Sequence, residues 1–281
     1  MTDKMSCYEI RKLLLPEVES SFVIPAWFLK GQKGLEHDDE VLWWAHECMK
    51  RILEVTPRDK FELIIVDNGS DKFSTIDDDG KKISTEDYFG YADVLVRHEK
   101  NLGYGPGMGA GIAVANGKYI FCLEDDIFPF PGWYEELIKT FSVEGLKKPV
   151  GLVHPWSIGC RGKRRARDTI TYDDPNLIWT GRVIYHPGKE WGGVHATLRS
   201  DFEKLKERDG YYFDPQFGLG YSEDKDLYKR VRHVLGKETY RCYKSVVFHS
   251  TGTSYSKLPG SKERMAKNKI LLKEKWRKLR I

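Results

Sequence analysis

The sequence has no paired cysteine motif and no long apolar run, and each absence makes a class of protein less probable. Its five cysteines are scattered without a CxxC pair or a zinc-ligand spacing, which favours free thiols in a reducing compartment. The longest apolar runs, such as SFVIPAWFL, are far shorter than the roughly 20 residues of a membrane-spanning helix. The first residues lack the apolar core of a signal peptide, so we expect a cytoplasmic protein.

The sequence also lacks a strong excess of charge of one sign. Its 46 basic and 42 acidic side chains leave a formal net charge of +4. Because this excess is small and spread among acidic stretches, no nucleic-acid partner is expected. The chain has 281 residues, 40% of them hydrophobic, which is enough for a sizeable core in one large domain or two small ones.

Apolar runs alternate with helical patterns in the first half of the chain. FVIPAWF, FELIIVD and ADVLVRH predict strands, and the intervening DDEVLWWAHECMKRILEV has apolar residues at helical spacing. A helix of small residues then leads into the strand KYIFCLED. This alternation predicts an α/β fold with a mainly parallel central sheet and helices on both faces. Ligands bind such sheets beyond the carboxyl ends of the strands.

Three acids, Glu124, Asp125 and Asp126, follow the last of these strands directly. Adjacent carboxylates repel one another, and a divalent metal ion is the common means of neutralising such a cluster. Residues two apart on an extended chain point the same way, so Glu124 and Asp126 could both reach one ion. The alternative is a solvated turn after the strand.

A second acidic pair begins the predicted helix SEDKDLYKRVRHVLG, with Ser222 as its expected N-cap. Asp224 falls on the apolar stripe that includes Leu227 and Val231. An acid on the inward face of a first turn either complements the helix dipole or faces a cavity, where it can act as a general base. Glu223 could serve the helix dipole equally well.

His249 ends the later strand SVVFH. It is either a structural residue or, if the fold brings it to the acidic triplet, a ligand of Mn²⁺ or Mg²⁺, since imidazole and carboxylates together suit such ions.

The glycine-rich stretch GYGPGMGAG supports a rival interpretation. Gly105, Gly107 and Ala110 fit the GxGxxA fingerprint of dinucleotide-binding proteins, and Glu124 lies at about the right distance to bind a ribose. This pattern predicts an oxidoreductase that uses NAD or a flavin. However, the fingerprint normally opens the first βαβ unit, whereas two predicted strands already precede it here. The other interpretation is that the glycines allow close helix packing.

Taken in order, the motifs resemble those of the inverting GT-A glycosyltransferases of family 2, and in particular their rhamnosyltransferase-like branch. The resemblance runs from about Phe22 to Ser254. It rests on FVIPAWF, FELIIVDNGS, NLGYGPGMGAGIAVANGKYIFCLEDD, IFPFPGWYEEL, GYYFDPQFGLGYSEDKDLYKRV and VVFHSTGTS. Asn68 stands where the family usually has a second acid.

The resemblance implies a GT-A fold and a metal-dependent transfer of a sugar, with inversion, from a UDP-, GDP- or dTDP-sugar. The acceptor would be the hydroxyl of a glycan, of a lipid-linked molecule or of another compound. The divalent cation, Mn²⁺ or Mg²⁺, would be held by Asp126 and His249. Glu124 would be a further ligand or a ribose contact, and Asp125 a ribose contact.

The resemblance also implies roles outside the metal site. Pro25 and Asp67 would flank the nucleotide base, and Asn101 would lie near its uridine or thymidine side. Asp224, beside Glu223, would be the general base. A non-catalytic protein that only binds a nucleotide or glycan is a further alternative, although the presence of both Asp224 and His249 argues against it.

The domain organisation follows from the extent of the resemblance. We expect one GT-A domain over residues 1–258, with a nucleotide-binding half at about 20–130 and an acceptor-side half at about 131–258. Residues 259–281 are expected to form a basic amphipathic helix that either docks on this domain or contacts an anionic membrane surface. Trp191 either stacks on a sugar or packs in the core.

Overall fold

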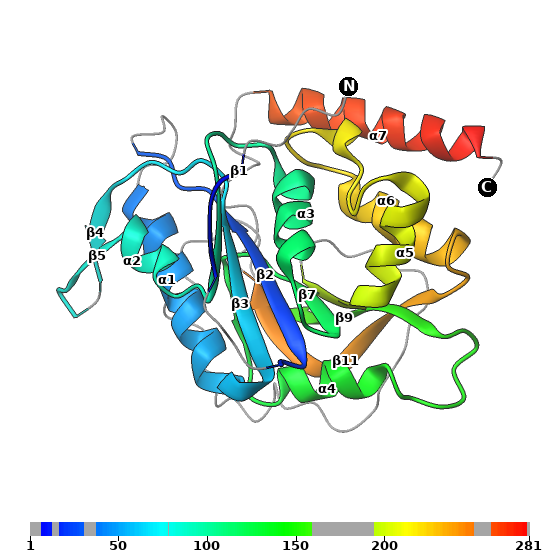
Figure 1. Ribbon diagram of the computed structural model, residues 1–281, viewed down its shortest axis with the longest axis horizontal. Helices are drawn as coiled ribbons and strands as arrows, with labels where there is room; N and C mark the ends of the chain where they lie inside the picture. Colours follow the sequence, from blue (N-terminus) through cyan, green and yellow to red (C-terminus); the bar gives the residue numbers. More distant parts are fainter. Residues whose placement is uncertain are drawn as a thin grey trace.

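The computed structural model (Figure 1) describes residues 17–30, 38–77, 79–158, 194–249 and 260–279, together with the backbone of 7–12; for 38–40 it likewise describes the backbone alone. Nine of the described strands form one sheet. In the order in which they lie side by side, they are β1 (Cys7–Lys12), β6 (Val94–His98), β3 (Phe61–Asp67), β2 (Ser20–Ala26), β7 (Tyr119–Cys122), β10 (His195–Leu198), β9 (Val150–Ile158), β11 (Glu238–His249) and β8 (Ile127–Pro129).

The half of the sheet that includes β2 is mainly parallel, as the sequence predicts. Strands β6, β3, β2 and β7 run in the same direction, and β1 pairs antiparallel with β6. The other half is mixed, because β10 runs antiparallel to both β7 and β9. Consequently the carboxyl ends of β2, β3 and β7 meet at one edge of the sheet, where Asp67 pairs with Ala26.

Helices cover both faces of the sheet (Figure 1). One face carries α1 (Asp38–Val55), α2 (Thr85–Phe89) and α4 (Trp133–Thr140), and the other carries α3 (Tyr104–Val114), α5 (Arg199–Asp209) and α6 (Glu223–His233). The remaining described elements are the hairpin β4 (Ser74–Ile76) and β5 (Lys82–Ser84), two 3₁₀ turns (Arg58–Lys60 and Pro215–Phe217) and α7 (Ser261–Lys278).

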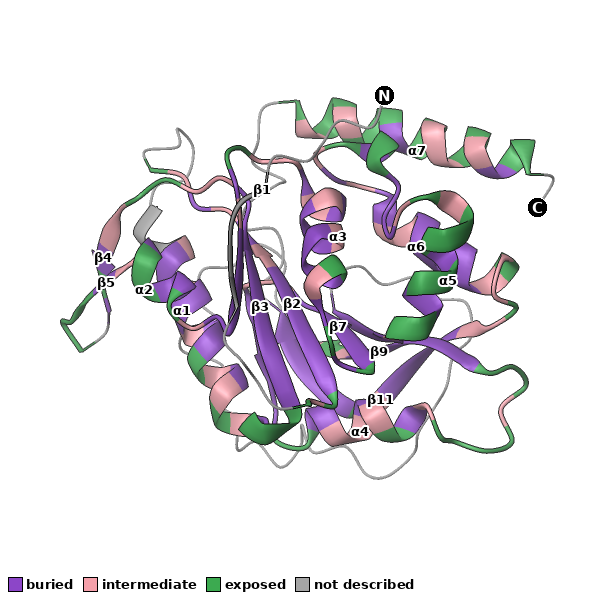
Figure 2. Ribbon diagram, in the orientation of Figure 1, coloured by how far each residue is buried: buried purple, intermediate pink, exposed green. Residues whose placement is uncertain are grey.

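The core divides into two layers because side chains alternate along each strand, and the central strands are buried (Figure 2). On β2, Phe22 and Ile24 belong to the layer under α1 and α4, while Val23 belongs to the layer under α3 and α6. All seven residues of β3 are buried, as expected for a strand covered on both faces. The continuous apolar pattern of FELIIVD therefore reflects its central place in the sheet.

Close packing explains the glycines of the small-residue helix α3. A Cβ atom added to Gly111 would lie 2.3 Å from Val23 Cγ1 of β2, so a larger residue would push the helix away from the sheet. One added to Gly107 would lie 3.4 Å from Pro25 Cβ and 3.3 Å from Asn68 Nδ2. The helix begins at Tyr104, earlier than its apolar pattern suggests.

The described cysteines Cys48, Cys122 and Cys242 are buried and free, in agreement with the free thiols expected from the sequence. Within the described residues, no helix is long and apolar enough to cross a membrane.

Two buried histidines lie between the sheet and α6. The rings of His154 on β9 and His195 on β10 are 5.8 Å apart, and each packs edge-on against Tyr228 of α6. Burial lowers the pKa of His154 to about 3, although its Nδ1 is hydrogen-bonded to the Val194 carbonyl. Burial, with a smaller effect of His154, lowers the pKa of His195 well below its ordinary value of 6.5. Both rings are therefore neutral in the folded protein at neutral pH.

This burial predicts a loss of stability in mild acid. Below pH 6.5 the unfolded chain binds a proton at His195 that the folded protein does not bind, so the free energy of unfolding falls as the pH falls. Replacing His195 with phenylalanine removes this proton uptake and keeps a ring against Tyr228. We expect the slope of unfolding free energy against pH, measured by urea denaturation below about pH 6, to decrease by about 1.4 kcal/mol per pH unit.

The exposed His233 provides a control. Its replacement by glutamine should change this slope far less, because solvent reaches the ring in both states. Equal slopes for the wild type and His195→Phe would contradict the prediction.

Candidate metal and nucleotide site

Three side chains from two strand ends converge on one point. Glu124 and Asp126 follow β7, and His249 is the last residue of β11. Nε2 of His249 lies 2.6 Å from Glu124 Oε2 and 3.1 Å from Asp126 Oδ1. The strand register explains this meeting, because β11 pairs with β8 so that His249 lies opposite Ile127, the residue after Asp126. Residues separated by more than 120 positions in the chain thus become neighbours.

In this cluster, burial and the neighbouring charges shift the pKa values of His249 and Glu124 in opposite directions. Burial alone would lower the pKa of His249, but the adjacent carboxylates of Asp126 and Glu124 outweigh it and raise this pKa well above the ordinary value. Burial would raise the pKa of Glu124, but His249 holds it below its usual range. His249 has a smaller effect on Asp125, and burial with the repulsion of Asp126 and Glu124 raises the pKa of Asp125 to about 8.

The cluster has the chemistry of a divalent metal site. One ligand atom from each of Glu124, Asp126 and His249 lies within 4.8 Å of the others. Asp126 and His249 are buried, and Glu124 is partly exposed, so the site is open to a ligand on one side. Two carboxylate oxygens and an imidazole nitrogen suit Mn²⁺ or Mg²⁺. Imidazole favours Mn²⁺ of the two, since Mg²⁺ prefers oxygen ligands.

Beside this cluster, the ends of β2 and β3 organise the loop that enters α3. Nδ2 of Asn68 donates hydrogen bonds to Asn101 Oδ1 and to the Gly103 carbonyl, while its Oδ1 accepts one from the Leu102 amide. Oδ1 of Asn101 also accepts a hydrogen bond from the Gly103 amide. A carboxylate at position 68 could not donate to these oxygens. The departure from the usual acid therefore has a structural reason.

Asp67 has contacts of its own at this edge. Its Oδ1 accepts a hydrogen bond from the Ser70 amide at 2.8 Å, and its Oδ2 lies 3.7 Å from Arg97 Nε. Burial raises its pKa, against the effects of Ser70 and Arg97. Pro25 is half-buried and close to Gly107. Pro25, Asp67 and Asn101 thus lie at or just beyond the ends of the neighbouring strands β2, β3 and β6.

The acidic pair Glu223 and Asp224 begins α6. Glu223 is buried, and the β and γ carbons of its side chain lie 3.7 Å from the position a Cβ on Gly105 would take. Burial, Asp224 and to a smaller extent Glu124 raise the pKa of Glu223 to about 8. Glu124, a residue of the metal cluster, is thus among the charges that act on Glu223. Asp224 is half-buried, and its Oδ1 accepts a hydrogen bond from the Lys225 amide.

The expectations for the start of α6 were partly wrong. Ser222 occupies the N-cap position, but its φ is 79° and its side chain makes no capping hydrogen bond. Asp224 is not the most buried acid of the first turn, because Glu223 is 7% exposed and Asp226 is fully buried. Sequence reasoning missed Asp226 because it considered one apolar face of α6, whereas α7 covers another face. Trp191 lies outside the described residues.

Residues 44–205 match the model of glycosyl transferase family 2. This segment is more than half of the 281 residues, so the chain belongs to that family. No curated protein sequence matches the chain significantly.

Several solved glycosyltransferase structures share the fold. The structure of GalNAc-T7 with UDP, GalNAc and Mn²⁺ is 16% identical in sequence and has a TM-score of 0.58. The superposition covers 86% of this chain and 45% of the GalNAc-T7 chain. The mannosyltransferase PcManGT from Pyrobaculum calidifontis, in complex with GDP-Man and Mn²⁺, is 17% identical with a TM-score of 0.52, covering 85% and 59%. TarS (1–349) from S. aureus is 13% identical with a TM-score of 0.50, covering 83% and 60%.

This chain thus spans between 45% and 60% of the length of those three proteins. At such low identities the comparison concerns the fold, and it confirms the predicted GT-A architecture with its mainly parallel sheet and helices on both faces.

Proposed function

We propose that this protein is a metal-dependent inverting glycosyltransferase that moves a sugar from a nucleotide-diphosphate sugar to an acceptor hydroxyl. The observation that carries the proposal is the convergence of Glu124, Asp126 and His249 at one strand edge of a family 2 fold. The structural relatives GalNAc-T7 and PcManGT were crystallised with Mn²⁺ and with UDP or GDP-Man. By analogy, the donor is a UDP-, GDP- or dTDP-sugar, including the dTDP-sugar of a rhamnosyltransferase.

The residues of this edge divide the binding of the donor between them. Asp126 and His249 would hold Mn²⁺ or Mg²⁺, with Glu124 as a third ligand or as a ribose contact. Asp125 would contact the ribose, while Pro25, Asp67 and Asn101 would surround the base. The bound cation supplies Lewis-acid stabilisation for the diphosphate leaving group. The hydrogen bonds of Asn68 hold Asn101 in place for this contact.

The acidic pair on α6 would act on the acceptor. Asp224 takes the proton from the acceptor hydroxyl while the oxygen of that hydroxyl attacks the anomeric carbon of the donor sugar. The bond from this carbon to the diphosphate breaks on the opposite face of the sugar. A single displacement of this kind inverts the anomeric configuration. Glu223, whose pKa is raised, precedes Asp224 in the first turn of α6 and is a second carboxyl group near the acceptor. The acceptor is a glycan, a lipid-linked molecule or another compound with a hydroxyl group.

A thermal-shift panel tests the proposal. UDP, GDP and dTDP and their sugars are each added with Mn²⁺, with Mg²⁺ or with EDTA. A ligand that binds only the folded state stabilises it by mass action. We expect at least one nucleotide at 100 times its Kd to raise Tm by about 5 °C with metal. EDTA should abolish the shift.

The same panel separates the alternative functions. Stabilisation by NADH or a flavin that is indifferent to EDTA would favour the dinucleotide oxidoreductase and overturn the proposal. Metal-dependent nucleotide binding without donor hydrolysis or transfer to any acceptor tested would favour a non-catalytic binding protein.

A further inference from the structure

The C-terminal helix α7 lies across the end of the molecule that carries α6 (Figure 1). Most of its side chains are exposed or half-buried, and Asn268 and Trp276 are the buried ones. The helix is therefore docked on the domain, as one of the two sequence interpretations expected. These two buried side chains do not form a continuous apolar stripe, and both make polar contacts with the domain.

Asn268 binds the loop that precedes α6. Its Nδ2 lies 2.7 Å from the Phe217 carbonyl, 2.7 Å from the Gly220 carbonyl and 3.1 Å from the Tyr221 carbonyl. One side-chain amide thus gathers three backbone carbonyls of a single loop. The amide comes from a helix more than 40 residues further along the chain.

That loop has an unusual backbone. Tyr221 and Ser222 have φ values of 73° and 79° and are the two non-glycine residues with positive φ in the part of the chain that the structure describes. Gly218 and Gly220 in the same loop also have positive φ. Residues other than glycine adopt a positive φ at a cost in free energy, and such conformations persist where surrounding contacts impose them. The hydrogen bonds from Asn268 are contacts of this kind.

The loop also touches the nucleotide side of the site. A Cβ atom added to Gly103 would lie 2.1 Å from the Gly218 carbonyl oxygen. The loop therefore packs directly on the entry to α3, and its far end carries Glu223 and Asp224. Any shift of the loop moves these acids relative to the strand ends.

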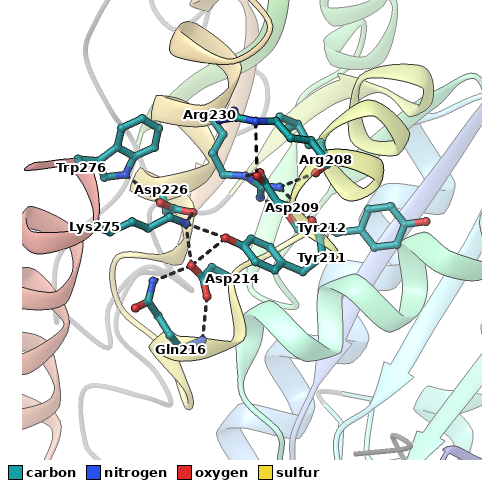
Figure 3. A network of polar contacts seen from close by, with 11 residues as sticks. Arg208, Asp209, Tyr211, Tyr212, Asp214, Gln216, Asp226, Arg230, Lys275 and Trp276 are labelled. Carbon is teal, nitrogen blue, oxygen red and sulfur yellow. Dashed lines mark hydrogen bonds and ion pairs between the residues drawn. The ribbon is translucent and has the colours of Figure 1, made fainter. Parts of the chain in front are cut away.

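A second group of contacts fixes the first turn of α6 (Figure 3). Nζ of Lys275 lies 2.7 Å from Asp226 Oδ2 and 2.7 Å from Asp214 Oδ2, and Nε1 of Trp276 donates to Asp226 Oδ1 at 2.9 Å. Both oxygens of the buried Asp226 carboxylate are therefore bound by α7. Lys275 also contacts the hydroxyl of Tyr211 at 3.0 Å. Asp226 lies two residues after Asp224, so these bonds fix the turn that presents the acidic pair.

The base of this network is extensively hydrogen-bonded. Arg230 of α6 is buried, and it binds Asp209 and the carbonyls of Leu205, Tyr211 and Tyr212 (Figure 3). These bonds fix the segment between α5 and α6 that carries Tyr211 and Asp214. A cavity of about 410 Å³ opens beside the network, lined by Leu271 and Lys278 among others. Beside this cavity, the polar contacts of Lys275 and the buried Trp276 hold this end of α7.

We propose that α7 is a brace that sets the position of Glu223 and Asp224, with Asn268, Lys275 and Trp276 as positioning residues. The inference rests on the proposed function, since it concerns the acidic pair of that site. Asn268 holds the strained loop on one side of the pair, and Lys275 and Trp276 hold Asp226 on the other. The hydrogen bonds of these three residues go to residues 211–226, so the brace acts through the geometry of that segment.

Replacing Asn268 with aspartate tests the brace. The two side chains have the same shape, but aspartate presents an oxygen to the three carbonyls that Asn268 bonds. Replacing the exposed Lys269 with glutamine changes the net charge by the same amount and serves as control. In Asn268→Asp we expect amide hydrogen exchange in peptides covering residues 217–227 to become about tenfold faster, without acceleration in β2 and β3. Lys269→Gln should match the wild type.

Kinetics then separate positioning from general destabilisation. With the sugar nucleotide that the wild type hydrolyses or transfers, kcat of Asn268→Asp should fall about tenfold or more, because small misplacements of catalytic groups are costly. The KM for the donor and the Kd for UDP with Mn²⁺ should change less than about twofold, since the strand ends stay in place. Equal losses in kcat and in nucleotide affinity, or unchanged exchange at 217–227, would overturn the brace.

The two proposals can fail separately. If the wild type turns over no donor, the transferase proposal fails, while the exchange experiment still decides whether α7 holds the loop. If Asn268→Asp does not fold, Trp276→Phe replaces it, because phenylalanine keeps an aromatic ring and removes the donor to Asp226. Unchanged exchange in residues 223–227 of that variant would also overturn the brace.

Discussion

An Asp126→Ala variant is expected to lose metal-dependent nucleotide binding and nearly all turnover. Asp126 is buried and lies 3.1 Å from His249 Nε2 at the centre of the three-residue cluster. Removing it takes away an anionic ligand and leaves Glu124 and His249 to pair with each other at 2.6 Å. A site of that kind retains little net attraction for a divalent cation.

The expected loss is large because the leaving group is a charged diphosphate. Removing stabilisation of this kind of charge costs about 10²- to 10³-fold in kcat, or roughly 3–4 kcal/mol. The thermal shift produced by a nucleotide with Mn²⁺ should disappear in the variant. Its Tm without ligand is measured alongside, because the substitution removes both a partner of the buried His249 and a repulsive neighbour of Asp125.

Asp79→Asn is the matched control, because Asp79 is an exposed acid in the turn between β4 and β5. It should behave as the wild type in both assays. A nucleotide shift in Asp126→Ala that still depends on metal and has the wild-type size would show that the metal is held elsewhere.

The second large effect is expected from Asp224→Asn. This substitution keeps the size of the side chain and the acceptor for the Lys225 amide, but it removes the group that takes the acceptor proton. A general base contributes about 10²- to 10⁴-fold, so kcat should fall by that factor. Binding of UDP with Mn²⁺ should be unchanged, because Asp224 lies outside the metal cluster. The Asp126 and Asp224 variants thus differ in nucleotide binding, although both lose turnover.

Glu223→Gln distinguishes the two acids of the pair. Glu223 is buried, its pKa is raised to about 8, and it packs near Gly105 at the start of α3. We expect a smaller loss of kcat than in Asp224→Asn, because a half-buried carboxylate is accessible to an acceptor while the buried one is not. If Glu223→Gln costs more than Asp224→Asn, the assignment of the base is reversed.

Much of the nucleotide-binding half was predictable from local patterns. The helix at 38–55 and the strand FELIIVD have the predicted bounds, because their apolar spacing is long and regular. Family membership followed from motifs in sequence order, and the match over residues 44–205 confirms it. The acids at or just beyond the ends of β3 and β7 were likewise visible, since Asp67 ends one apolar run and the triplet from Glu124 to Asp126 follows another.

Other features were not visible in the local sequence. Ser222 is the N-cap residue, as predicted, but its φ of 79° leaves its side chain without a capping hydrogen bond. The loop before it is hydrogen-bonded by Asn268, which is distant in the sequence. Nothing in the local sequence indicated that Asp226 is buried and paired, since its partners Lys275 and Trp276 come from the end of the chain. The mixed half of the sheet was also missed, because strand direction depends on pairing between distant segments.

By itself, the sequence determined the α/β class, the family and which residue types stand at the strand ends, since these depend on spacing along the chain. Only the tertiary structure decided that His249 joins Glu124 and Asp126, through the pairing of β11 with β8. It also decided that α7 holds the turn carrying Glu223 and Asp224. Both are contacts between residues tens of positions or more apart, and short-range periodicity carries no information about such pairs.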